Sequence, residues 1–270
     1  MLRCLEELAK VGASAYVLAN PSCGQLKGGL PPAFEAKLTE LIAQAAGLSW
    51  IYRTEAVVGG SIALEPGTVA LLHDSYQDAS VVKSATAASG VVLSRNIFVD
   101  GKDSGVLYRR SFASSFRVLI QDGFRKRKNA DYLESSVDHF SDLHLTFRET
   151  GMDGFGDFLT VGQEYSESGG PAYAVAIHLT FLDEDVNSSL FVRHFVSDSN
   201  ATPADPAGKF GEALAKLVVA VNEPYSKFRK TDAVVEFLDL HARGHYPGLG
   251  YVKKLSMQHH LELMAEIEYD

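Results

Sequence analysis

The chain has 270 residues, of which 46% are hydrophobic and 22% are charged. This length and composition are typical of a folded globular protein and exclude a disordered chain. The 25 Lys and Arg residues against 34 Asp and Glu residues give a net charge of −9. That charge argues against nucleic-acid binding by the whole surface, while a local basic patch stays open.

Cysteine usage and hydropathy point to the cytoplasm. The only two cysteines, Cys4 and Cys23, are too few for a disulfide framework. The N-terminus carries charges every few residues, unlike a signal peptide, and no apolar run approaches the roughly 20 residues that span a bilayer. We therefore expect a cytoplasmic protein with no membrane partner.

The first half of the chain alternates short apolar runs with amphipathic segments. Helical spacing predicts helices over 2–10, 31–45 and 77–89, and apolar runs predict strands over 15–19, 49–53, 69–72, 91–94 and 117–121. Such alternation is typical of parallel βα units covered on both faces. Residues 97–112 are rich in turn formers, which predicts a hairpin or an extended loop.

The second half shows longer patterns. Apolar residues at helical spacing predict a helix over 137–149, and a strand follows over 158–161. Strict alternation predicts a strand over 173–181, and residues 190–197 are its expected antiparallel partner. Asp205-Pro206 is typical of a helix start. Two further helices are predicted, one over 231–243 and one at the end of the chain.

Together these elements predict one α/β domain over residues 1–270, with mostly parallel strands in a barrel-like arrangement. An antiparallel hairpin near 173–197 interrupts the βα alternation. A domain that begins with a helix feeding a buried strand is unusual. We therefore expect that one or more N-terminal βα units are missing from this sequence.

The acidic residues near strand ends are the first candidate site. In a (β/α) barrel, catalytic residues lie at the carboxyl ends of the strands. The residues that follow predicted strands or lie in the adjoining acidic loop are Asn20, His73, Asp74, Asn96, Asp122, Glu164 and Glu167. Several acids on one rim can bind a divalent cation or act as general acid and base.

We therefore take Asp122, Glu164 and Glu167 as candidate catalytic residues, with Asp122 and Glu164 as ligands of a divalent metal ion. The alternative is that these acids only cap helices and solubilise loops. The loop that carries the two glutamates lies in the stretch from Gly151 to Pro171, which is glycine-rich and long. Loops of this kind tend to be functional, so we expect it to line a cleft with Asp122 and the basic run described next.

A basic run, RKRKNADY, follows the strand over 117–121. Arg125, Lys126 and Arg127 can clamp the phosphates of a nucleotide or nucleic acid, and with Asn20 and Asp74 they form the candidate ligand-binding set. A solvated basic loop is the alternative.

The histidines indicate a metal-binding or catalytic site less strongly than the acids and the basic run do. Adjacent side chains on a helix point about 100° apart, so His259 and His260 cannot readily share a metal ion. His178 and His194 are placed to face each other across the predicted hairpin. Satisfied core histidines are the commoner outcome for such a pair.

Three segments of the chain resemble a known family. They are GFGDFLTVGQEYSESGGPAYAVAIHLTF, HFVSDSNATPADPAGKF and GHYPGLGYVKKLSMQHH. Together they are similar to the bacterial and phage "beta protein" family and its uncharacterised bacterial relatives, over roughly the last two thirds of the chain. The resemblance implies an additional βα unit at the N-terminus of relatives, and it supplies no catalytic residues.

The resemblance also implies a function. Relatives occur on phages and mobile elements beside a small nuclease-like protein, in what resembles a two-gene cassette of defence type. We therefore expect an accessory protein that acts with a nuclease-like partner or as a homo-oligomer. The alternative is a metal-assisted hydrolase, similar to a phosphodiesterase, with Asp122 and Glu164 on the metal ion and Lys126 and Arg127 on the phosphate.

Overall fold

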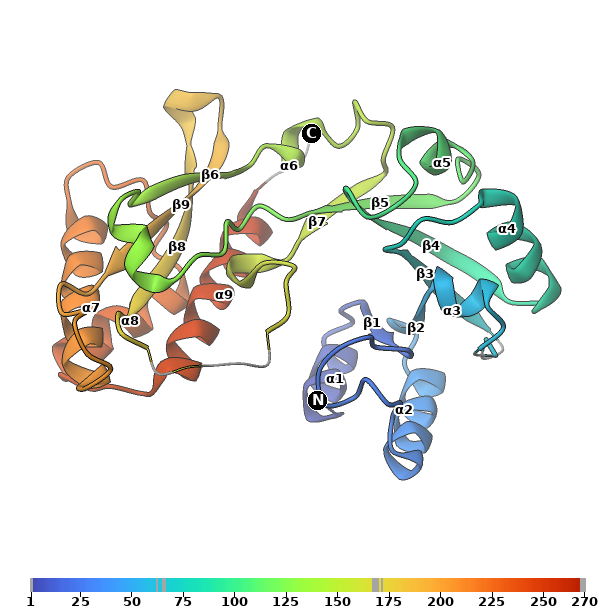
Figure 1. The fold of residues 1–270 in the computed structure, drawn as a ribbon, viewed down its shortest axis with the longest axis horizontal. Helices are drawn as coiled ribbons and strands as arrows, with labels where there is room; N and C mark the ends of the chain where they lie inside the picture. The colour runs from blue at the N-terminus through green and yellow to red at the C-terminus, as the bar shows by residue number, and fades with distance from the viewer. Residues whose placement is uncertain (1, 62, 65–66, 167–169, 171, 268–270) are drawn as a thin grey trace. The chain divides into compact units, whose positions relative to one another are not determined.

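The computed structural model describes residues 2–61, 63–64, 67–166, 170 and 172–267 (Figure 1). The chain divides into two compact units. Unit 1 comprises Met1–Ile120 and Phe147–Gly156, and unit 2 comprises Gln121–Thr146 and Asp157–Asp270. Each unit is described by itself below, and the expectation of one domain over 1–270 stays a prediction. Among the described residues, no helix has the length and apolar character needed to cross a membrane.

A six-stranded sheet is the centre of unit 1. Its strand order is β1-β2-β3-β4-β5-β7, with bounds β1 (Ala15–Leu18), β2 (Leu48–Arg53), β3 (Thr68–His73), β4 (Val92–Val99), β5 (Phe116–Gln121) and β7 (Gly154–Asp157). All pairs from β1 to β5 are parallel. The sheet curls like part of a barrel wall (Figure 1). The expected α/β class with mostly parallel, barrel-like strands is confirmed.

Helices connect the strands of unit 1. They are α1 (Leu2–Lys10), α2 (Pro32–Gln44), α3 (Thr54–Val58), α4 (Ala79–Ala88) and α5 (Val106–Arg110). The caps follow from the sequence: Pro32 is the first residue of α2, and the Asp78 carboxylate accepts a hydrogen bond from Ser80 N at 2.7 Å before α4. The predicted loop over 97–112 is wrong in part, because β4 continues to Val99 and α5 follows.

Unit 2 is built on a three-stranded antiparallel sheet with the order β6-β9-β8. The strands are β6 (Val137–Ser141), β8 (Ala176–Asp183) and β9 (Ser189–Val196). The helices are α6 (Leu143–Thr146), α7 (Pro206–Asn222), α8 (Asp232–Ala242) and α9 (Leu249–Glu266), with short 3-10 turns η1 (Asn129–Leu133), η2 (Leu159–Val161) and η3 (Glu184–Val186). The antiparallel hairpin expected near 173–197 is confirmed as β8 and β9.

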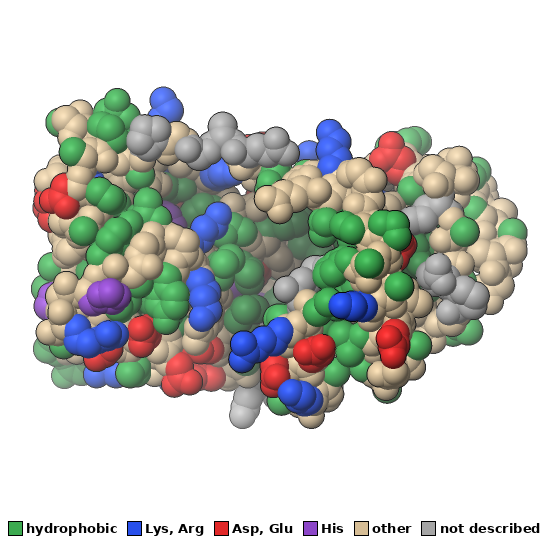
Figure 2. Space-filling view, turned by 90° about the horizontal axis from the view of Figure 1, so that it is seen from below, with side chains coloured by type: hydrophobic (Ala, Val, Ile, Leu, Met, Phe, Trp, Pro, Cys, Tyr) green, Lys and Arg blue, Asp and Glu red, His purple; other side chains and the backbone are tan. Residues whose placement is uncertain are grey.

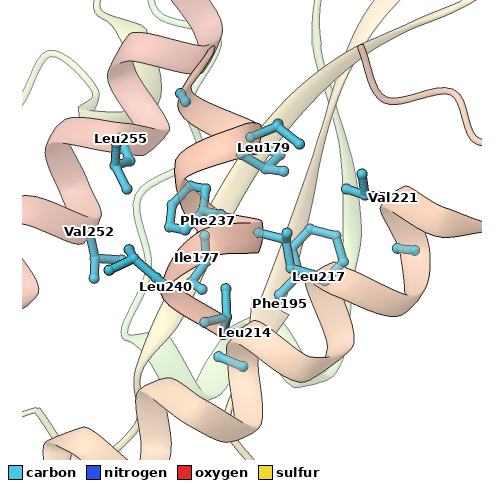
Figure 3. Close-up of a cluster of buried hydrophobic side chains, with 14 of the residues drawn as sticks. Ile177, Leu179, Phe195, Leu214, Leu217, Val221, Phe237, Leu240, Val252 and Leu255 are labelled. Carbon is cyan, nitrogen blue, oxygen red and sulfur yellow. The ribbon is translucent and has the colours of Figure 1, made fainter. Parts of the chain in front are cut away.

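The main core of unit 2 lies between the β8–β9 hairpin and helices α7, α8 and α9 (Figure 3). The side chains that meet there include Ile177, Leu179, Phe195, Leu214, Leu217, Phe237, Leu240, Val252 and Leu255. Each such side chain contributes about 1.5–3 kcal/mol when it is fully buried. A second cluster contains Phe124, Tyr132 and Phe140 together with Val192 of β9. The segment after β5 therefore packs on this sheet through aromatic rings.

Two further secondary-structure predictions, both in the second half of the chain, are wrong. The predicted helix over 137–149 is strand β6 followed by the short α6, because Val137 to Ser141 pair with Arg193 to Leu190 of β9. The predicted strand over 158–161 is the 3-10 turn η2. Leu159 has a φ of 53°, and its N–H donates a hydrogen bond to the Asp157 carboxylate at 2.7 Å. The backbone therefore turns after Asp157, where β7 ends.

Candidate functional site

In unit 1 the candidate residues Asn20 and Asp74 come together through Arg53. Asn20 Oδ1 accepts a hydrogen bond from Arg53 N at 2.9 Å, and Arg53 Nε donates to Asp74 Oδ2 at 2.6 Å. The three residues follow or end neighbouring strands β1, β2 and β3. The parallel sheet thus brings strand ends together as the sequence predicts. The ligand-binding role of Asn20 and Asp74 stays a prediction. His73 and Asn96 of unit 1 also come together, with His73 Nε2 2.8 Å from Asn96 Oδ1.

In unit 2, Asp122 holds two backbone segments together. Asp122 Oδ1 accepts from Phe124 N at 3.0 Å, and Oδ2 accepts from Gln163 N at 2.8 Å. Lys126 Nζ donates to the carbonyl oxygen of Glu164 at 2.8 Å. Gln163 and Glu164 of the acidic loop therefore lie beside Asp122 and Lys126. The expectation that this loop lines a cleft together with Asp122 and the basic run stays a prediction.

The catalytic and metal-binding roles of these acids stay predictions. Glu167 lies outside the described residues. In the described part of the chain, no three His, Cys, Asp or Glu side chains come together in a way that can hold a metal ion. Arg125 is exposed, and its carbonyl oxygen accepts a hydrogen bond from the Tyr132 hydroxyl at 3.0 Å.

A cavity of about 220 Å³ opens beside the basic run of unit 2. Its wall consists of Phe124, Lys126, Arg127, Asn129, Tyr132, Thr160, Val161, Ala176, His178, Leu249, Val252, Lys253 and Ser256. These residues come from the segment after β5, from η1 and η2, from β8 and from the first two turns of α9. Among the residues that the structure describes, no Asp or Glu lines this cavity.

The cavity wall is cationic although the chain as a whole is acidic. On the face of the molecule drawn in Figure 2, Lys and Arg side chains lie interspersed with Asp and Glu side chains. The cavity wall instead combines three cations, Lys126, Arg127 and Lys253, with aromatic and aliphatic side chains.

A chain of hydrogen bonds leads from the cavity wall into the sheet. His178 Nδ1 lies 2.7 Å from His194 Nδ1, and His194 Nε2 lies 3.2 Å from Asp138 Oδ2. Arg127 pairs with the same carboxylate: its Nη2 donates to Oδ1 at 3.1 Å, and its Nη1 lies 2.9 Å from Oδ2 in an ion pair without hydrogen-bond geometry. The pairing of β8, β9 and β6 produces this row, because His178 lies opposite His194 and His194 lies next to the residue paired with Val137.

Burial sets the charge states along this row. Burial, the neighbouring His194 and Lys253 lower the pKa of His178 to about 3. Burial also lowers the pKa of His194, against the opposing effect of Asp138. Burial alone would raise the pKa of Asp138, but its hydrogen bonds from Arg127 and His194 lower it below the ordinary value. At pH 7 both rings are therefore neutral and Asp138 is a carboxylate.

Some residues of this site are predictable from the sequence and others are not. Lys126 and Arg127 were candidates and line the cavity. His178 and His194 were expected to face each other, which is confirmed. Asp138 was missed because its segment read as a helix, although the alternation of buried Asp138 and Phe140 with exposed neighbours is a strand signal. Thr160 carries no motif, and Lys253 belongs only to the short basic pair Lys253-Lys254, a weaker signal than the run at 125–128.

Comparisons with known proteins identify no relative of this chain: no family model, no curated protein and no solved structure matches it.

Proposed function

We propose that unit 2 is a binding module for a small anionic ligand, which occupies the cavity beside the basic run. The observation that carries this proposal is the cavity wall, which combines three cations with no acidic side chain among the described residues. Cations that converge on a hollow with apolar walls attract anions strongly, because the low dielectric of the walls strengthens the interaction.

Lys253 is the cation best able to meet a ligand. Lys126 already donates to the Glu164 carbonyl, and Arg127 is paired with Asp138. Lys253 lies on the exposed side of α9 and makes no hydrogen bond or ion pair with another described residue. An anion in the cavity gives this ammonium group a partner.

Thr160 supplies a second, independent indication. The residue is 4% exposed and lines the cavity, and its hydroxyl is buried without a hydrogen-bond partner in the described part of the chain. A buried hydroxyl without a partner costs about 1–3 kcal/mol. A ligand oxygen within reach of Thr160 removes that penalty, so the hydroxyl favours an occupied cavity.

The size of the cavity limits the ligand. At about 220 Å³ it is smaller than the roughly 300–1,000 Å³ of sites for drug-sized molecules. It suits an inorganic oxyanion, a short carboxylate or one anionic group of a larger molecule. A larger hollow of about 480 Å³ around Lys227 differs, because Asp183 and Asp185 already pair with that lysine.

Isothermal titration calorimetry of the full chain against orthophosphate, pyrophosphate and succinate tests the proposal. We expect at least one of these anions to bind, and Lys253→Gln to weaken binding about 10-fold, since each tenfold is about 1.4 kcal/mol. Lys254→Gln is the matched control, because Lys254 is the next residue, is also exposed, and lies over the Tyr251 ring instead of lining the cavity. Equal losses in the two variants, or no binding of any anion, contradict the proposal.

The accessory role in a phage or mobile-element cassette is a separate proposal that rests on the sequence resemblance. Co-expression with the neighbouring nuclease-like protein tests it, with co-purification as the expected result and independent elution on sizing as the contrary one. The metal-assisted hydrolase with Asp122 and Glu164 likewise stays a prediction. Binding of Mg²⁺ or Mn²⁺ that is lost in Asp122→Asn would support it.

A further inference from the structure

The carboxylate of Asp138 determines where the two histidines carry their protons. A carboxylate oxygen only accepts hydrogen bonds, so His194 Nε2 is the protonated nitrogen of its ring. A neutral imidazole carries one proton, so His194 Nδ1 is an acceptor. The contact of 2.7 Å between the two Nδ1 atoms then requires that His178 Nδ1 donates. His178 Nε2 is therefore unprotonated and carries a lone pair.

This nitrogen is the atom through which His178 can meet a ligand. His178 lines the cavity, and its Nδ1 is already engaged with His194. In the part of the chain that the structure describes, its Nε2 makes no hydrogen bond. The cavity thus combines cations that attract an anion with one nitrogen that accepts a hydrogen bond and cannot donate one.

Resting on the anion-binding function proposed above, we propose that the cavity selects an oxyanion that carries a proton, a phosphate in preference to a sulfate. Inorganic phosphate keeps at least one P–OH group at neutral pH and can donate it to His178 Nε2. Sulfate has no proton at this pH and places an oxygen lone pair against the nitrogen lone pair. The other polar groups do not discriminate, because Lys253 donates to either anion and the Thr160 hydroxyl can donate or accept.

His194, Asp138 and Arg127, which follow His178 in the hydrogen-bonded row, keep His178 Nε2 unprotonated. His194 cannot turn its proton toward His178 without leaving Nε2 as a lone pair against the Asp138 carboxylate. Arg127 Nη2 and the Ser135 hydroxyl both donate to Asp138 Oδ1, at 3.1 and 3.2 Å, and fix the orientation of that carboxylate. Tyr132 packs against the His194 ring, with centroids 4.2 Å apart, and limits its rotation. Arg127, Asp138 and His194 are therefore positioning residues for the acceptor at His178.

Titration calorimetry with sodium phosphate and sodium sulfate at pH 7.5 and matched ionic strength tests the inference on the full chain. We expect phosphate to bind about 10-fold more tightly or better, the size expected for one buried acceptor left without its donor. Equal affinities overturn the selectivity and leave anion binding standing. If neither anion binds, the proposed function fails as well.

Two variants separate the mechanism from a general loss of binding. In Asp138→Asn, Arg127 Nη2 donates to the amide oxygen, and the amide nitrogen donates to His194 Nε2. His194 then carries its proton on Nδ1 and donates it to His178 Nδ1. His178 in turn carries its proton on Nε2, which becomes a donor. We expect sulfate to gain affinity and the phosphate preference to fall to about 3-fold or less, because the unpaired acceptor is gone. An unchanged preference in a folded Asp138→Asn protein overturns the proposed row.

His178→Gln keeps the test decisive if Asp138→Asn unfolds. A glutamine amide can donate or accept, so phosphate and sulfate are expected to bind alike. The matched control is His139→Gln in β6, where the ring is exposed and contacts Phe191. The control should keep the wild-type preference. A preference retained in His178→Gln assigns the selectivity to other groups and overturns the inference.

Discussion

At the scale of single residues, Gly123 shows how closely the cavity floor packs on the sheet. It lies between Asp122, which holds the acidic loop, and Phe124, which lines the cavity. A Cβ at this position would lie 2.5 Å from the carbonyl oxygen of Phe140 and 2.7 Å from its ring. The backbone oxygen belongs to strand β6 and cannot move freely, so only glycine fits.

We expect Gly123→Ala to destabilise unit 2 by about 1–3 kcal/mol, the usual cost of overpacking a core. Displacement of Phe124 should also weaken anion binding. Urea denaturation followed by circular dichroism measures the first effect, and calorimetry with phosphate measures the second. Wild-type stability in Gly123→Ala would show that the segment shifts away from Phe140 without penalty.

At the scale of elements, helix α7 has a stabilising N-terminal cap and a destabilising glycine in its interior. Asp205 caps the helix, with its carboxylate accepting from Gly208 N at 2.9 Å, and Pro206 follows as the first helical residue. Within the helix, Gly211 has no atom within 4 Å of the position that a Cβ would take. The helix therefore carries one glycine that packing does not require.

We expect Gly211→Ala to stabilise unit 2 by about 0.5–1 kcal/mol, because alanine loses less backbone entropy than glycine on forming a helix. This variant is also the matched control for Gly123→Ala, since the chemical change is identical. The unfolding midpoint in urea should move in opposite directions for the two. A loss of stability in Gly211→Ala would mean that α7 meets a neighbour at this position.

The cap of α7 gives a second prediction at this scale. Asp205→Ala removes the side-chain acceptor, and we expect a loss of about 1 kcal/mol. Asp205→Gly should lose only a few tenths, because the residue has a φ of 51° and glycine adopts this conformation without strain. Thermal unfolding of the two variants measures the difference. Equal losses would show that the hydrogen bond alone decides the stability of this cap.

At the scale of the whole molecule, the two units differ in their buried histidines. In unit 2, burial lowers the pKa of His178 to about 3 and that of His259 to about 4, and it also lowers the pKa of His194 and His144. In the described part of unit 1, His73 is the histidine of this kind, with a pKa lowered to about 4 by burial. It is held between Tyr108 and Asn96.

This difference predicts that unit 2 loses stability faster than unit 1 as the pH falls. Each folded-state pKa lies below the unfolded value of about 6.5, so the unfolded chain binds more protons below pH 6.5. Stability is therefore complete above pH 6.5 and is lost progressively toward pH 4, by up to about 1.4 kcal/mol per pH unit for each histidine. Hydrogen exchange of both units at pH 7 and pH 5 measures the loss. Preferential opening of unit 1 at pH 5 would contradict the prediction.

Much of the fold follows from local patterns in the sequence. The apolar runs of β1 to β5, the helical stripes of α2, α4, α7 and α8, and the caps at Asp78 and Asp205 are short-range signals. Each concerns neighbours within one element, so it can be read without knowing the rest of the structure. The same holds for Lys126 and Arg127, whose basic run marks a candidate binding surface by composition alone.

The site itself was decided by tertiary pairing. Strand β6 is only five residues long, and its apolar spacing fits a helix as well as a strand, so its partner β9, some 50 residues later, determines its structure. That pairing moves Asp138 next to His194, and the β8–β9 register moves His194 next to His178. The proton positions in this row, and with them the acceptor in the cavity, depend on contacts between distant segments. The sequence alone determined most of the elements and the cations Lys126 and Arg127, because these are short-range signals, and only the tertiary structure decided which groups line the cavity.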